Sequence, residues 1–223
     1  MERINPLYHH YLLLETSRSA LSLGEKERAD LKKEFIRALK TSPLAIFSYS
    51  VKGFRSNASL LLWLSGDSLS EIQVCVNELT GGKFRSLVKI REVYFGKTGP
   101  TQYKKGGLPS REIKVSAPRR KYLIVYPFTK TTEWYLLPFN KRKIMMTEHI
   151  KIGMRYSAVD QLLLYCFGMN SHEFVVSYET DKIDEFQDLV MELRGARGRR
   201  YTANDTPVTL GIYLSHEEVV RYI

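Results

Sequence analysis

The side chains best suited to chemistry gather between residues 122 and 169 of the 223-residue chain. This stretch opens with YLIVYPFTKTTEWYLL, in which Tyr126 and Lys130 are four residues apart and Trp134 follows. Alternate side chains of an extended strand share a face, so Tyr126 and Lys130 are expected to point the same way. A phenol can donate a proton or carry a radical, and an ammonium can hold an anion. The alternative is an amphipathic strand end with an exposed lysine.

A second candidate, His149, lies in the segment FNKRKIMMTEHIKIGMRY, which begins at residue 139. Met145, His149, Ile152 and Tyr156 recur at helical spacing and form one apolar face. The five histidines of the chain show no paired His or Cys spacing typical of zinc or non-haem iron. A porphyrin supplies four nitrogens of its own, so a site with a single histidine suits haem. The alternative is a hydrogen-bonded core histidine.

Basic residues give the chain a formal net charge of +10 and cluster in two places, from Lys104 to Lys121 and from Arg194 to Arg200. Arginine pairs with carboxylates through two parallel hydrogen bonds, so a porphyrin with several carboxylates would favour such clusters. Solvated loops are the plain alternative. The charge alone would also allow a nucleic-acid binder, but no nucleic-acid motif is present and we expect no such partner.

The elements that must position these residues occur twice. The segment SGDSLSEIQVCVNELTGG, residues 65–82, matches ETDKIDEFQDLVMELRGA, residues 179–196, at a constant spacing of 114 residues. Asp67 falls on Asp181, and Glu78 falls on Glu192. This match indicates an internal duplication, with chance similarity of two amphipathic helices as the alternative.

Each half predicts the element order βαββαβ, the ferredoxin-like unit, so the fold class is α+β with two such units in one chain. Two units packed face to face would cover the sheet faces that their own helices leave bare. We expect an N-terminal half at 1–98, a Gly/Pro-rich linker or lid at 99–119, and a C-terminal half at 120–223. The predicted strands are 8–15, 44–52, 57–65, 86–96, 121–129, 161–167, 173–180 and 207–214, and the predicted helices are 25–40, 69–80, 138–155 and 183–194.

The motifs of residues 122–214 resemble the chlorite dismutase family, whereas the N-terminal half matches mainly in architecture. In chain order the matching runs are YPFTK from 126, EWY from 133, MTEH from 146, IG from 152, FVV from 174, ETD from 179, RRYT from 199 and DTP from 205. The resemblance implies a dimeric α+β barrel, bound haem b or iron-coproporphyrin III, and a homopentamer, with a hexamer left open. It makes His149 the axial ligand of the iron.

One position separates two activities of the family. The resemblance implies an arginine on the distal side of the haem in chlorite dismutases and a glutamine in coproheme decarboxylases. Counting back seven residues from Gly168 places Gln161 there, with a one-residue gap near Ser157. Without a cation facing it, a bound chlorite would lack its main electrostatic stabilisation.

The resemblance gives the remaining site residues their expected roles in a peroxide-dependent decarboxylation of iron-coproporphyrin III to haem b. Tyr126 would abstract hydrogen from a propionate, and Lys130 would hold that propionate or move a proton. Trp134 would line the pocket, and Arg200 would anchor another propionate. Decarboxylases also place an Arg-x-Tyr ahead of the tyrosine, whereas here only Arg111 is found, without the matching tyrosine.

Two other activities remain open for such a chain. It could be a true chlorite dismutase, which releases oxygen from chlorite, or a haem carrier or sensor on the same barrel, since a fold does not fix a function. No apolar run is long enough to span a membrane, and the N-terminal residues lack the pattern of a signal peptide. Two cysteines inside apolar segments, without a CxxC, favour a reducing cytoplasm.

Overall fold

The computed structural model describes residues 7–100, 103 and 112–223. The N-terminal half contains the order predicted from the sequence: β1 (Tyr8–Thr16), α1 (Glu25–Thr41), β2 (Ala45–Ser50), β3 (Leu60–Gly66), α2 (Leu69–Thr80) and β4 (Val88–Lys97). The 3₁₀ turns η1 (Arg18–Ser22) and η2 (Gly82–Ser86) follow β1 and α2.

The C-terminal half repeats this order and adds short pieces. Its elements are β5 (Tyr122–Lys130), α3 (Thr132–Leu136), α4 (Phe139–Arg155), β6 (Val159–Tyr165), β7 (Phe174–Thr180), α5 (Ile183–Arg194), η3 (Arg197–Tyr201), β8 (Thr202–Asn204), β9 (Thr209–Leu214) and η4 (His216–Arg221). The predicted helix 138–155 is confirmed as α4. The sequence did not predict α3 and β8, because runs of three to five residues carry no periodicity.

Strand pairing closes the two halves into one barrel. Around it the strands follow the order β1, β3, β2, β9, β5, β7, β6 and β4, and β8 pairs with the end of β5. The halves meet where β2 pairs with β9 and where β4 pairs with β6. The duplicated ferredoxin-like α+β fold is therefore confirmed, and the two sheets join at their edges as well as facing each other.

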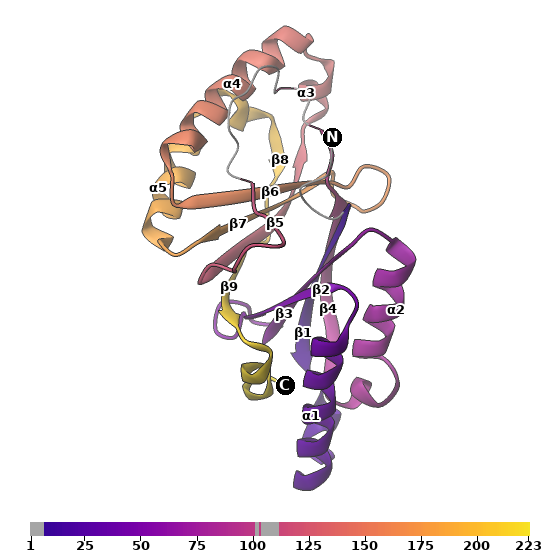
Figure 1. Ribbon diagram of the computed structural model, residues 1–223. Coiled ribbons are helices and arrows are strands. Elements are labelled where there is room, and N and C mark those ends of the chain that lie inside the picture. The colour runs from indigo at the N-terminus through magenta and orange to yellow at the C-terminus, as the bar shows by residue number, and fades with distance from the viewer. Residues whose placement is uncertain (1–6, 101–102, 104–111) are drawn as a thin grey trace.

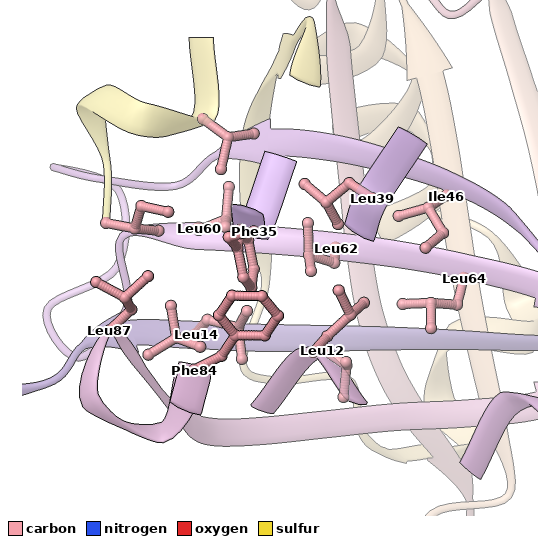
Figure 2. Packing of buried hydrophobic residues seen from close by; sticks show 14 of the residues in the cluster. Leu12, Leu14, Phe35, Leu39, Ile46, Leu60, Leu62, Leu64, Phe84 and Leu87 are labelled. Atoms are coloured by element: carbon pink, nitrogen blue, oxygen red, sulfur yellow. The ribbon is translucent and has the colours of Figure 1, made fainter. Parts of the chain in front are cut away.

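Three apolar clusters fill this architecture. One occupies the barrel interior and takes residues from both halves, including Tyr11, Trp63 and Val125. The second lies between the outer face of the N-terminal sheet and α1, α2 and η2, where Phe35 and Phe84 meet edge to face (Figure 2). The third lies between the C-terminal sheet and helices α4 and α5, which Figure 1 shows over β5, β6 and β7.

The chain end returns to the N-terminal half. In Figure 1 the yellow C-terminal turn, η4, lies beside α1, and Val219 and Ile223 join the second cluster. The predicted division at 1–98, 99–119 and 120–223 stays a prediction, and residues 101–102 and 104–111 of the linker lie outside the described residues. No described helix has the length and apolarity needed to cross a bilayer.

Candidate functional site

A cavity of about 270 Å³ lies between the outer face of the C-terminal sheet and the helices that cover it. The sheet wall is formed by side chains of β5, β6 and β7, and the helix wall by α4, α5 and η3. The sheet wall includes Tyr126, Phe128, Lys130, Gln161, Leu163, Val176 and Tyr178, and the helix wall includes Met146, His149, Ile150, Val190, Leu193, Arg194 and Arg199.

Strand β5 presents three lining residues in a row. Tyr126, Phe128 and Lys130 alternate along the strand and all face the cavity, as the spacing predicts. Burial raises the pKa of the Tyr126 phenol, so the phenol keeps its proton over the whole neutral range. Phe128 stacks on Phe174 with ring centroids 4.6 Å apart, which fixes the middle of this wall.

Lys130 lies at the polar end of the row. Its Nζ donates to Thr202 Oγ1 at 3.2 Å and lies 4.9 Å from the centre of the Trp134 ring. Burial, and to a lesser extent the positive charge of Arg199, lower the Lys130 pKa to about 8, against the opposite effects of Glu173 and Asp205. At neutral pH the ammonium is therefore mostly charged, and its pKa is close enough to the ambient pH for it to release or take up a proton.

His149 projects from α4 between Met146 and Ile150 of the same wall. Burial lowers its pKa to about 4, with a further contribution from Lys130, so the imidazole is neutral at physiological pH. Among the residues that the structure describes, none forms a hydrogen bond with His149. A neutral imidazole nitrogen facing an apolar cavity is the form in which histidine binds a metal.

Gln161 stands on the sheet wall, on β6, where it pairs with Tyr178 of β7. Its backbone carbonyl accepts a hydrogen bond from the Ile113 N–H at 3.0 Å, which ties the end of the linker to the rim of the cavity. The cavity therefore places a neutral amide on the wall formed by the sheet and an imidazole on the wall formed by the helices.

A sequence model of the chlorite dismutase family matches residues 25–214. This chain belongs to the chlorite dismutase family. Two curated relatives are named coproheme decarboxylase. The one from Mycolicibacterium smegmatis is 26% identical over 205 residues, covering 89% of this chain and 87% of the relative. The one from Staphylococcus saprophyticus is 26% identical over 161 residues, covering 66% and 64%.

Solved structures give the same family fold. A variant of the chlorite dismutase from Candidatus Nitrospira defluvii superposes with a TM-score of 0.88 at 20% identity, covering 97% of this chain and 94% of that chain. The same enzyme in complex with imidazole superposes with a TM-score of 0.85, also at 20% identity, with the same coverage. At this identity the likeness supports the fold and not the reaction.

The residues present fit an iron porphyrin, the ligand class that membership of the chlorite dismutase family implies. Among the described residues no group of three or more His, Cys, Asp or Glu side chains could hold a metal ion alone. A porphyrin iron needs only one or two protein ligands, and His149 supplies a neutral nitrogen in an apolar cavity. The cations Lys130, Arg194 and Arg199 at the cavity would pair with porphyrin carboxylates.

The structure separates the predicted site residues into those that line the cavity and those that do not. Tyr126, Lys130, His149 and Gln161 line it together. Trp134 is 3% exposed and lies behind Lys130, where it packs against Tyr201.

The structure describes only one of the two predicted arginines. Arg200 is exposed and is not among the lining residues, and Arg111 falls outside the described residues. The neighbouring Arg199 lines the cavity instead, within the cluster Arg194–Arg200 that the charge pattern had indicated.

Sequence reasoning missed the side chains that complete the polar end of the cavity. Asp205 accepts hydrogen bonds from Arg194 Nη1 and Arg199 Nη1, each at 2.9 Å, and so holds two arginines in place. A cluster of arginines before an aspartate was visible in the sequence, but which arginine lines the cavity depends on the 3₁₀ turn η3. Tyr178 was also missed, although its position two residues after the lining Val176 on β7 could have indicated it.

Proposed function

We propose that this protein decarboxylates iron-coproporphyrin III to haem b at the expense of hydrogen peroxide. The observation that carries the proposal is the composition of the sheet wall: Tyr126, Lys130 and Gln161 all line it, and no arginine of the described residues does. In place of Gln161 a chlorite dismutase would need an arginine, a fixed cation that stabilises its anionic substrate. The curated relatives named coproheme decarboxylase agree with this choice.

Binding of the porphyrin would use both walls. His149 would ligate the iron from the helix wall, and the lining side chains Phe128 and Leu163 would cover the flat face of the ring on the other side. Iron bound in this way supplies the capacity to reduce peroxide and to oxidise a neighbouring group. The propionate carboxylates would pair with Lys130, Arg194 and Arg199.

Tyr126 would carry the oxidation to the substrate. Its phenol stays protonated at neutral pH because burial raises its pKa, so it can lose a hydrogen atom and later regain one from a propionate side chain. For each propionate, one peroxide and one –CH₂CH₂COOH group give –CH=CH₂, CO₂ and two molecules of water. Lys130 would orient the carboxylate next to Tyr126 and, with a pKa of about 8, can hold or release a proton as charge changes.

The test adds ferric coproporphyrin and hydrogen peroxide to the protein and follows the porphyrin by mass spectrometry. The proposal predicts loss of two carboxyl groups in the wild type and retained binding without conversion in Tyr126→Phe. Tyr122→Phe is the matched control, because Tyr122 lies on the same strand but does not line the cavity. Oxygen release from chlorite without conversion of coproporphyrin would favour chlorite dismutation instead. Porphyrin binding with neither reaction would favour a carrier or sensor.

We further propose that the protein works as a ring-shaped homo-oligomer, a pentamer or a hexamer, in the cytoplasm. Both cysteines, Cys75 and Cys166, are free and buried, which suits a reducing compartment. Light scattering coupled to size-exclusion chromatography would give the subunit number, and a monomeric mass at micromolar concentration would contradict the assembly.

A further inference from the structure

A second tyrosine lies next to Tyr126 in the sheet wall. Strands β5 and β7 are antiparallel, with Tyr126 opposite Val176 and Tyr178 opposite Ile124. Tyr126 and Tyr178 are therefore diagonal neighbours on one face of the sheet. Their rings lie nearly parallel, at 27°, with centroids 6.1 Å apart, and both line the cavity.

Tyr178 is buried on the sheet wall of the cavity. Its side chain is 5% exposed, and Phe186 of α5 covers it with a ring centroid distance of 5.2 Å. The equivalent strand position in the N-terminal half, 114 residues earlier, is Leu64, which packs in an apolar cluster and has no hydroxyl of its own. A leucine would fill such a place without the cost of burying a polar group.

The two phenols influence each other in opposite directions. The Tyr178 hydroxyl lowers the pKa of Tyr126, although burial has the larger effect and raises it. Burial and Tyr126 together hold the pKa of Tyr178 well above its ordinary value. Both phenols keep their protons at neutral pH, and the more strongly raised pKa of Tyr178 favours its hydroxyl as the donor toward the oxygen of Tyr126.

We propose that Tyr178 is a positioning residue that acts through Tyr126 by hydrogen-bonding to its phenol oxygen and exchanging a hydrogen atom with it. This inference rests on the proposed function, in which hydrogen peroxide and the bound iron porphyrin oxidise Tyr126. When Tyr126 has lost a hydrogen atom, the O–H bond of Tyr178 breaks and the O–H bond of Tyr126 forms. The exchange needs no further oxidant or reductant. It leaves the unpaired electron on the Tyr178 ring, which Phe186 and the sheet shield from solvent.

The experiment compares wild type, Tyr178→Phe, Tyr126→Phe and the double variant, with Tyr122→Phe as the control that removes a hydroxyl from the same strand. Each protein is loaded with haem b, the product, so that no substrate consumes a radical. It is then mixed with hydrogen peroxide, frozen within milliseconds and measured by high-field EPR. Conversion of ferric coproporphyrin is followed in parallel by mass spectrometry, and porphyrin affinity by absorbance titration.

The proposed exchange between Tyr126 and Tyr178, called the pair below, leads to three expected results. Tyr178→Phe binds porphyrin like the wild type but converts it about tenfold more slowly, since one hydrogen bond to the reacting group is lost. Its tyrosyl radical shows a larger highest g value, because a hydrogen bond to a phenoxyl oxygen lowers that value. Tyr126→Phe forms no tyrosyl radical on Tyr178, because the oxidation reaches Tyr178 through Tyr126, and the double variant behaves in the same way.

The measurements distinguish failure of the proposed Tyr126–Tyr178 exchange from failure of the proposed function. A wild type that converts no coproporphyrin overturns the proposed function. A wild type that converts it, with an unchanged g value in Tyr178→Phe or with a Tyr178 radical that persists in Tyr126→Phe, overturns only the proposed Tyr126–Tyr178 exchange. Slower conversion in Tyr178→Phe that is explained by weaker porphyrin binding would give Tyr178 a packing role and also overturn the pair.

Discussion

The two halves of the barrel arrange the same elements in the same order, yet they fill the space between sheet and helices differently. In the N-terminal half this space is a closed apolar cluster of leucines and phenylalanines (Figure 2). In the C-terminal half it is a cavity with a histidine, a lysine, a glutamine and two stacked tyrosines on its walls. The backbone therefore does not decide which half can hold a ligand.

Individual positions show how the difference arises. The matched elements lie 114 residues apart, from β1 at Tyr8 and β5 at Tyr122 to α1 at Glu25 and α4 at Phe139. At this spacing the apolar cluster of the first half and the cavity of the second pair up as Leu12 with Tyr126, Leu14 with Phe128, Phe35 with His149 and Leu64 with Tyr178.

The second strand of the C-terminal half lies one residue later than the 114-residue spacing predicts. Ile46 pairs with Leu64 in the first half, and Gln161 pairs with Tyr178 in the second, so Gln161 corresponds to Ile46 at a spacing one longer than elsewhere. The one-residue gap expected near Ser157 concerns a comparison with the family and stays a prediction. The observed shift keeps Gln161 on the outer face of the sheet, since a slip by one residue would turn it into the barrel interior.

The largest effect on stability is expected at Phe35, the counterpart of His149. Phe35→Ala should lower the free energy of unfolding by about 3–5 kcal/mol, because the side chain is 0% exposed and its loss leaves a cavity. Urea denaturation followed by circular dichroism measures this. The folded fraction should bind ferric coproporphyrin normally. Weakened binding by folded Phe35→Ala would contradict the division in which the N-terminal cluster stabilises the fold and the C-terminal cavity binds the ligand.

His149→Ala should weaken porphyrin binding and leave the stability of the fold nearly unchanged. Porphyrin affinity should fall by at least about 100-fold, because loss of a ligand exceeds the effect of losing its supporting contacts. Stability should change little, since no described residue forms a hydrogen bond with His149. Absorbance titration with ferric coproporphyrin measures the affinity, and His172→Ala is the matched control outside the cavity. Equal affinities for wild type and His149→Ala would remove His149 from the site.

Lys130 should make porphyrin binding depend on pH. Its pKa of about 8 means that the free protein loses this positive charge as the pH rises through 8, whereas a bound carboxylate favours the charged form. Binding above pH 8 then takes up a proton, so affinity should fall by up to about tenfold per pH unit. Titrations from pH 6.5 to pH 9.5 test this. Lys130→Met should flatten the profile, and an unchanged slope in that variant would assign the proton to another group.

The smallest effects separate two neighbouring arginines. Arg199 lines the cavity and pairs with Asp205, so Arg199→Ala should weaken porphyrin binding about fivefold. Arg200 is exposed and outside the lining, and Arg200→Ala should change affinity by less than about twofold. Isothermal titration calorimetry at fixed ionic strength resolves both values. A larger loss in Arg200→Ala would restore the role expected from the sequence.

The fold was predictable to a large extent, because periodic patterns and the internal repeat both report on long elements. Every expected strand and helix is present within a few residues. The closure of the barrel through the β2–β9 and β4–β6 edges was not visible, since edge pairing depends on how two sheets meet. The return of η4 to the N-terminal half was hidden for the same reason.

The site was predictable where alternation or motif spacing fixes a direction, as for Tyr126, Lys130, His149 and Gln161. Arg199 and Arg200 are adjacent in the sequence, and only the geometry of η3 decides which one turns toward the cavity. Trp134 on α3 lies near Lys130 but packs against Tyr201 of η3 and does not line the cavity. Such choices depend on short, irregular segments that a periodic pattern does not describe.

The most direct test of this account is a crystal structure of the protein with ferric coproporphyrin. We expect one porphyrin per chain, between α4 and the C-terminal sheet, with its iron bound by His149 and with Tyr126, Lys130 and Gln161 on the opposite wall. The cluster around Phe35 should stay closed. A porphyrin bound elsewhere, or an iron ligated by a residue other than His149, would contradict the account.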